Sequence, residues 1–240
     1  MTTPAESMQM IYKDVLANYL ISMARTVERS VEYALDALLG PNQERAEALS
    51  SQVLLIEPHI NEMEILIDDH AVRLLRTGLA DEEEIRRVVA SQKIANDLER
   101  IGDLAANIAE RVISLADMEL TETPPELEPM SGAVRGMLGR SLGALIFRNV
   151  VLAGEVLESD DVVDRYRDQI FERLLAGIIQ EPSHAAPRLQ FLLATRYLER
   201  IADHSTNIAE DIIFWVRGQD VRHGRTRIYG DPLNALATTS

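Results

Sequence analysis

Two stretches of this sequence lie one hundred residues apart and are almost the same: Leu98-Glu99-Arg100-Ile101-Gly102-Asp103 and Leu198-Glu199-Arg200-Ile201-Ala202-Asp203. After three further residues, each stretch continues with the same four residues, Asn-Ile-Ala-Glu, at 107–110 and at 207–210. A match of this length at one fixed offset indicates an internal repeat. The chain therefore contains two copies of one structural unit.

The pattern around the repeated stretches predicts three helices in each unit. Apolar residues recur at three- and four-residue spacing almost throughout, and the sustained alternation that is typical of strands is absent. Glycine, proline and capping residues divide this pattern into segments at 8–39, 43–77, 81–118, 131–157 and 159–179, and into a last one that follows a turn at 181–187 and ends near 218. The predicted fold is all-α, with six long helices in two tandem three-helix bundles.

The same punctuation predicts the domain organisation. The first repeat is expected at 1–120 and the second at 131–218, with a linker at 121–130 that is rich in proline, threonine and glutamate. The residues at 219–240 lose helical periodicity and are expected to form a loose tail.

Composition excludes several classes of function. No cysteine is present among the 240 residues, which excludes disulfides, thiolate nucleophiles and sulfur-ligated zinc. The net charge of -15 argues against a nucleic-acid partner and against adhesion to an anionic membrane. No signal peptide is visible, and no apolar stretch is long enough to insert into a bilayer, so a cytoplasmic location is expected.

The repeated stretch places acidic residues on one side of its helix. At about 100° per residue, Glu99, Asp103, Asn107 and Glu110 fall within about 80° of one another. The leucine and isoleucines of the same stretch gather on the opposite side, which must pack into the bundle. The acidic stripe is therefore expected to face outward or toward a groove, and the second copy has the same geometry.

Further oxygen donors at four-residue spacing lie on the helix that precedes each copy. These are Glu57 and Asn61 in the first unit, and Asp160 and Asp164 in the second. Carboxylates one helical turn apart repel each other, and a bound cation would remove that repulsion. Oxygen donors suit hard ions such as Mg²⁺, Mn²⁺ or iron. Because Asn61 is neutral and Pro58 would kink a helix or mark its start, the second unit is the better candidate.

Other interpretations of these residues stay open. The stripes can be solvated acidic faces, and Arg100 and Arg200 can simply pair with the aspartates three residues later. The chain has no glycine-rich phosphate loop, nucleophile elbow or His-Glu-x-x-His motif. His204 lies about 100° away from the acidic stripe, and none of the five histidines is a convincing ligand. The sequence therefore offers few candidate catalytic residues.

The second copy, from Leu198 to Glu210, resembles the signature of the PhoU phosphate-uptake regulators, which typically reads Glu-Arg-Ile-Gly-Asp-His-Ala-x-Asn-Ile-Ala-Glu. The segment at 60–68 resembles the second helix of that family, and the segment at 216–223 resembles the end of its last helix. The resemblance spans nearly the whole chain. It implies two three-helix bundles related by duplication.

The resemblance also implies multinuclear metal clusters of iron, manganese, magnesium or zinc. In this family such clusters are held on the bundle surfaces by paired acidic-x-x-x-acidic motifs. The matching residues here are Glu57, Asn61, Glu99 and Asp103 in the first repeat, and Asp160, Asp164, Glu199 and Asp203 in the second. The first site departs from the pattern, because Asn61 replaces an acid and Leu104 stands where the second copy has His204.

As a function, the resemblance implies a negative regulator of phosphate uptake and of phosphate-regulon signalling. Such a protein is a cytoplasmic, dimeric adaptor that contacts a sensor histidine kinase and the phosphate ABC transporter. Two alternatives remain at this point. One is an enzyme with a carboxylate-bound metal inside a helical bundle, and the other is a structural module whose acidic stripes bind nothing.

Overall fold

The computed structural model describes residues 4–40, 42–79, 81–118, 122–222 and 227–228. The first repeat contains α1 (Pro4–Leu39), α2 (Gln43–Arg76) and α3 (Glu82–Ala116). The second contains α4 (Leu127–Phe147), α5 (Val150–Leu157), α6 (Asp160–Gln180), a 3-10 turn (Pro182–His184) and α7 (Ala185–Arg217). The predicted all-α fold of two tandem three-helix bundles is confirmed, with α4 and α5 together in the place of one helix.

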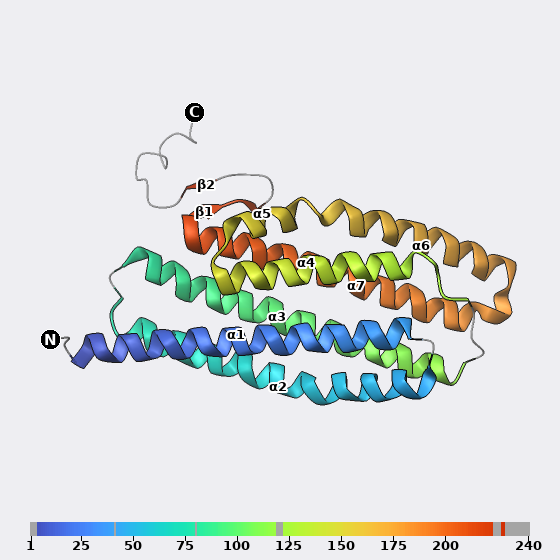
Figure 1. Cartoon of the computed structure of the whole chain (residues 1–240), viewed down its shortest axis with the longest axis horizontal. Helices are drawn as coiled ribbons and strands as arrows, with labels where there is room; N and C mark the ends of the chain where they lie inside the picture. The colour runs from blue at the N-terminus through green and yellow to red at the C-terminus, as the bar shows by residue number, and fades with distance from the viewer. Residues whose placement is uncertain (1–3, 41, 80, 119–121, 223–226, 229–240) are drawn as a thin grey trace.

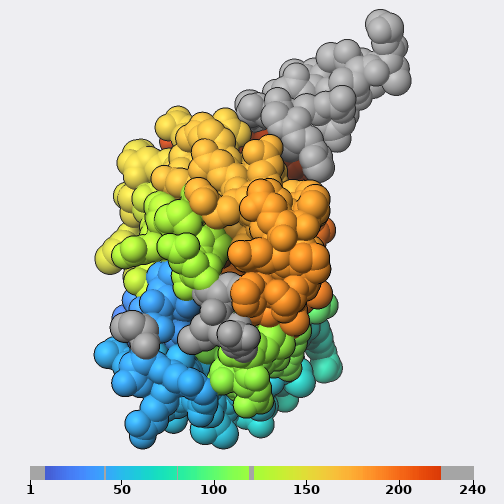
Figure 2. Space-filling view, turned by 90° about the vertical axis from the view of Figure 1, so that its right-hand side faces the viewer, coloured from blue at the N-terminus to red at the C-terminus, as the bar shows by residue number. Residues whose placement is uncertain are grey.

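The two bundles lie side by side, with their long helices along the long axis of the molecule (Figure 1). The helices α3 and α7, which carry the repeated motif, pack against each other at the centre. Seen from one end, the first repeat in blue and cyan lies below the second repeat in yellow and orange (Figure 2). The duplication therefore places its two motif helices at the contact between the repeats.

The apolar side of each motif helix forms the core, as its periodicity predicts. Leu98, Ile101 and Ile108 of α3 are fully buried, and so are their counterparts one hundred residues later in α7. Burial of aliphatic surface of this kind contributes about 25 cal/mol per Å² of apolar area. The acidic stripe is thereby forced to the other side of each helix.

The helix α2 runs from Gln43 through Pro58 to Arg76, so it does not begin at the proline. It starts where the Asn42 side chain accepts a hydrogen bond from the Arg45 amide at 2.8 Å, which is an ordinary N-cap. The continuous helix keeps Glu57 and Asn61 one turn apart on one face. These two candidate donors of the first repeat thus share a single helix.

The prediction of one continuous helix at 131–157 is wrong in its start and in its continuity. Helix α4 starts at Leu127, inside the stretch expected as a linker, and ends at Phe147. Arg148 then adopts a left-handed conformation with φ of 50°. The side chain of Asn149 accepts hydrogen bonds from the amides of Val151 at 2.9 Å and Leu152 at 3.3 Å, which starts α5. The apolar pattern continues across this break, because both helices pack on the same core.

The segment expected as a loose tail begins with ordered structure instead. Gln219–Asp220 (β1) pairs with Arg227–Ile228 (β2) in an antiparallel ladder, so the expectation was wrong for these residues. Within the expected tail, residues 221–222 are also described, whereas 223–226 and 229–240 lie outside the described residues, as does the first residue of the expected linker. No helix in the described part of the chain is both long enough and apolar enough to cross a membrane.

Candidate functional site

The donors predicted in the first repeat come together where α2 packs on α3. Asn61 donates a hydrogen bond from Nδ2 to Oε1 of Glu57 at 2.6 Å. On α3, the Glu99 side chain is only 15% exposed, while that of Asp103 is 35% exposed. The acidic stripe therefore lies in the seam between two helices, and the expected groove is favoured over a fully outward face.

The carboxylates of this first group repel one another. Burial raises the pKa of Glu99, and the nearby carboxylates of Asp103, Glu64 and Glu57 raise it further, against the opposing effect of Arg100. Burial also raises the pKa of Asp103, where Arg100 lowers it and Glu57 raises it again. Each group is therefore easier to protonate than a free carboxyl, which means that the site favours added positive charge.

Two oxygen atoms of the first group are buried and lack a hydrogen-bond partner: Oε2 of Glu99 and Oδ1 of Asn61. Arg100 Nε lies 3.4 Å from the former, as an ion-pair contact with less than ideal geometry. An unpartnered buried oxygen costs roughly 1–3 kcal/mol, and a hard cation would remove that cost. These residues fit an oxygen-ligated metal ion. No three histidine, aspartate or glutamate side chains of the described residues already converge on one point, so binding requires side-chain rotation.

The second group joins the start of α6 to the middle of α7. Burial raises the pKa of Asp160, with further increases from Asp164, Asp161 and Glu199. Burial likewise raises the pKa of Asp203, where Glu199, Asp160 and Asp164 add to the effect. The four predicted donors of the second repeat are therefore neighbours in space as well.

An arginine that sequence reasoning missed lies within this second group. Arg167 Nη1 is 2.7 Å from Oδ1 of Asp164 and 2.6 Å from Oε1 of Glu199, so it links α6 to α7. The sequence did contain a signal for the ion pair with Asp164, because Arg167 follows it by one helical turn and lies on the same face of the helix. The sequence favoured the second repeat as the better metal site, but its carboxylates already have a cation.

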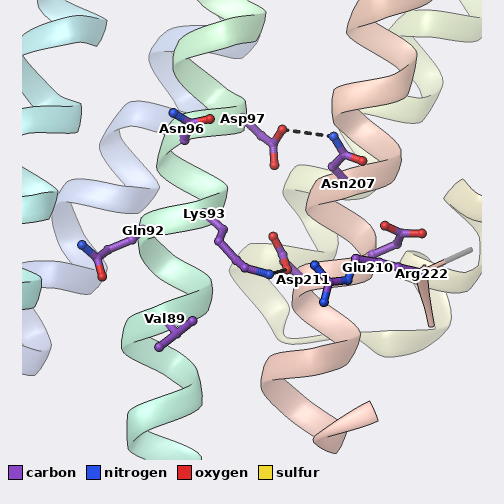
Figure 3. Close-up of a pocket in the computed structure, with 9 residues that line it drawn as sticks. All are labelled: Val89, Gln92, Lys93, Asn96, Asp97, Asn207, Glu210, Asp211 and Arg222. Carbon is purple, nitrogen blue, oxygen red and sulfur yellow. Dashed lines mark hydrogen bonds and ion pairs between the residues drawn. The ribbon is translucent and has the colours of Figure 1, made fainter. Parts of the chain in front are cut away.

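A cleft of about 570 Å³ lies between α3 and α7 near β1, at one end of their contact. In Figure 3, Lys93 reaches from α3 toward Asp211 of α7, with Nζ 2.8 Å from Oδ1, and Asn207 donates to Asp97 at 3.2 Å. Just beside the cleft, Nδ1 of His204 lies 2.7 Å from Oδ1 of Asp97. The cleft is lined by Val89, Gln92, Lys93, Asn96, Asp97, Asn207, Glu210, Asp211 and Arg222. These polar contacts join the two repeats, and the contact of His204 with Asp97 is one of them.

The PhoU domain family matches this sequence twice, over residues 20–112 and 127–212. The chain belongs to the PhoU family. The second match begins at the first residue of α4, and each match contains one copy of the repeated motif. The resemblance seen in the sequence is thus confirmed for both repeats.

Individual PhoU relatives cover most of the chain. A protein of Pseudomonas aeruginosa named phosphate-specific transport system accessory protein PhoU homolog is 35% identical over 215 residues, which are 88% of this chain and 86% of the relative. A Clostridium acetobutylicum protein of the same name is 30% identical, over 86% of this chain and 93% of its own.

Solved PhoU structures share the fold. The crystal structure of PhoU from Pseudomonas aeruginosa superposes with a TM-score of 0.81 at 32% identity, over 87% of this chain and 98% of that one. The phosphate transport system regulatory protein PhoU from Streptococcus pneumoniae has a TM-score of 0.78 at 24% identity, over 89% and 99%, and shows the fold alone.

The raised carboxyl pKa values of this PhoU family member predict how its stability depends on pH. A carboxyl with a higher pKa in the folded state binds protons more tightly when folded, so it destabilises the fold above that pKa. We expect these carboxyls to make the free energy of unfolding of the metal-free protein increase as the pH falls through their raised pKa values toward the ordinary carboxyl pKa of about 4. Urea denaturation in the presence of a chelator measures this.

The control for the pH dependence is the double variant Glu99→Gln/Asp103→Asn, which lacks two of the four carboxyls. It should show a flatter dependence over the same pH range. Equal slopes for the variant and the wild type would contradict the assignment of the effect to these carboxyls.

Proposed function

We propose that this PhoU family member is an accessory regulator of phosphate-specific transport that restrains phosphate uptake and phosphate-regulon signalling. The observation that carries the proposal is that similarity to proteins named as accessory proteins of that transport system extends over both repeats. A shared single bundle would support only a common fold. Similarity along the whole length supports a common role.

The proposed mechanism is contact with two partners on the cytoplasmic side, the phosphate ABC transporter and a sensor histidine kinase. The outer helices of the two repeats, α2 and α6, lie at opposite edges of the molecule (Figure 1). Both expose large apolar side chains, Leu55 and Ile65 on α2, and Phe171 and Ile179 on α6. Where such side chains form a contiguous patch they mark a binding surface, and two edges of this kind would suit an adaptor.

We further propose that the two acidic groups hold divalent or trivalent metal ions, from iron, manganese, magnesium or zinc. In the first repeat Glu57, Asn61, Glu99 and Asp103 would bind the metal, and in the second Asp160, Asp164, Glu199 and Asp203. A bound ion would neutralise the mutual repulsion of the carboxylates and join the two helices that carry them. The unpartnered oxygens of Glu99 and Asn61 support this role for the first group.

The alternative of a carboxylate-metal enzyme has less support. Such a site is expected to place helical histidines among the acids. His204, the histidine next to the second group, is directed at Asp97 across the repeats. The named relatives are described as accessory proteins. A homodimer is also proposed, on the family resemblance.

Deletion of the gene for this chain in its own host, combined with a reporter of phosphate-starvation genes, tests the proposal. We expect the deletion to switch the reporter on in phosphate-rich medium, because a restraint is lost. The wild-type protein supplied in trans should switch it off again. Co-purification of the intact protein with the transporter and with the kinase tests the two contacts separately. Unchanged reporter expression in the deletion strain would show that the proposed regulation is wrong.

A further inference from the structure

The guanidinium of Arg167 is the centre of the second acidic group. In addition to Asp164 and Glu199, its Nη2 contacts Oδ1 of Asp168 at 2.9 Å. Three carboxylates from two helices thus share one cation. An arginine guanidinium stays protonated under physiological conditions, so the positive charge at this position is permanent.

The first repeat has a similar group of carboxylates but a different residue at the position of Arg167. The position that corresponds to Arg167, three residues after the second donor of the preceding helix, holds Glu64. Glu64 adds a further negative charge near Glu99. The cation nearby is Arg100, which lies on α3 itself and leaves Oε2 of Glu99 without a hydrogen bond. Each group therefore has one arginine, but Arg100 stays 3.4 Å from Glu99 and Asp103 on its own helix, whereas Arg167 makes contacts of 2.6–2.7 Å that span two helices.

We propose that Arg167 is a built-in cation that competes with a metal ion for the carboxylates of the second repeat, so that the first repeat is the tighter metal site. The part that concerns metal rests on the proposed function. A metal ion entering the second group must displace Arg167 from Asp164 and Glu199, two of its own ligands. Charge-assisted hydrogen bonds of 2.6–2.7 Å oppose that exchange. Entry into the first group displaces an arginine only from the longer Arg100 contacts to Glu99 and Asp103, both at 3.4 Å. The bond that Asn61 donates to Glu57 there comes from a neutral amide.

The same geometry makes Arg167 a structural link. Without it, Asp160, Asp164, Glu199 and Asp203 would face one another without the guanidinium that now lies between Asp164 and Glu199. Removing Arg167 should therefore loosen the contact between α6 and α7 and make that contact dependent on metal. Both effects can be measured without any assay of biological activity.

The test uses the full chain in the Glu99→Gln/Asp103→Asn background, in which binding to the first site is suppressed. Arg167→Gln removes the charge, Arg167→Lys keeps it but loses the forked geometry, and Arg165→Gln is the matched control. Arg165 lies two residues away on α6, is exposed, and is outside the group. After metal stripping, calorimetric titration with Mn²⁺ and the melting temperature with and without Mn²⁺ are recorded for each protein.

We expect Arg167→Gln to bind Mn²⁺ about tenfold more tightly than its parent, the lower end of what a neighbouring group contributes to metal affinity. Its melting temperature should fall without Mn²⁺ and recover with it. Arg167→Lys should lie between the two, and it remains informative if Arg167→Gln does not fold. Arg165→Gln should match the parent in both measurements.

Unchanged Mn²⁺ affinity and melting temperature in both Arg167 variants would overturn the inference. An equal change in Arg165→Gln would do the same, because it would reduce the effect to overall charge. If no protein, wild type included, binds Mn²⁺, the metal part of the proposed function fails and so does the proposed exchange. A selective loss of stability in Arg167→Gln would then still establish Arg167 as the cation that holds α6 to α7.

Discussion

The double substitution Glu99→Gln/Asp103→Asn is expected to weaken metal binding in the first repeat by at least about 100-fold while the helices stay intact. Outer partners of a metal site contribute 10- to 100-fold in affinity, and these two residues would be direct ligands. Amides keep the size of the side chains but lose the charge that a hard cation needs. The apolar side of α3 is untouched, so the fold has no reason to change.

Elemental analysis of protein purified without chelator, followed by Mn²⁺ titration, measures the loss. Circular dichroism checks the helices. Glu128→Gln/Glu172→Gln removes the same charge from exposed positions and is the matched control. The corresponding second-repeat variant, Glu199→Gln/Asp203→Asn, should lose less metal, because Arg167 already occupies that group. Unchanged metal content in the first-repeat variant would show that Glu99 and Asp103 are not ligands.

Ile101→Ala is expected to lower the free energy of unfolding by about 2–5 kcal/mol, the range for truncating a buried isoleucine. Ile101 is fully buried in α3, and α3 packs both on its own bundle and on α7. The cavity would therefore form in the core to which α3 contributes. The equivalent substitution Ile201→Ala should cost about the same, because its site is fully buried in α7.

Urea denaturation followed by circular dichroism measures this effect. Ile113→Ala is the control, since it truncates the same residue type on the same helix at a position that is 37% exposed. It should cost about 1 kcal/mol or less. Equal losses for Ile101→Ala and Ile113→Ala would mean that the buried side of α3 does not carry the stability assigned to it.

Much of this molecule follows from local patterns in its sequence. Helical periodicity and caps predict the long helices, and the repeat at 98–110 and 198–210 predicts two equivalent bundles. Where local signals compete, the prediction fails. The apolar pattern runs across Arg148 and Asn149, yet the backbone turns left-handed at Arg148 and Asn149 caps a new helix. The metal ligands are still a prediction, supported by how their carboxylates crowd together.

The sequence by itself determined the all-α fold, the duplication and the side of each helix that carries oxygen donors. These depend on the rotation per residue of a helix, which is the same in every protein. Only the tertiary structure decided which charges meet. Arg167 between Asp164 and Glu199, and Lys93 against Asp211, come from pairs of helices whose separation and register are set by the packing of their apolar sides. Spacing along the chain carries no information about that packing.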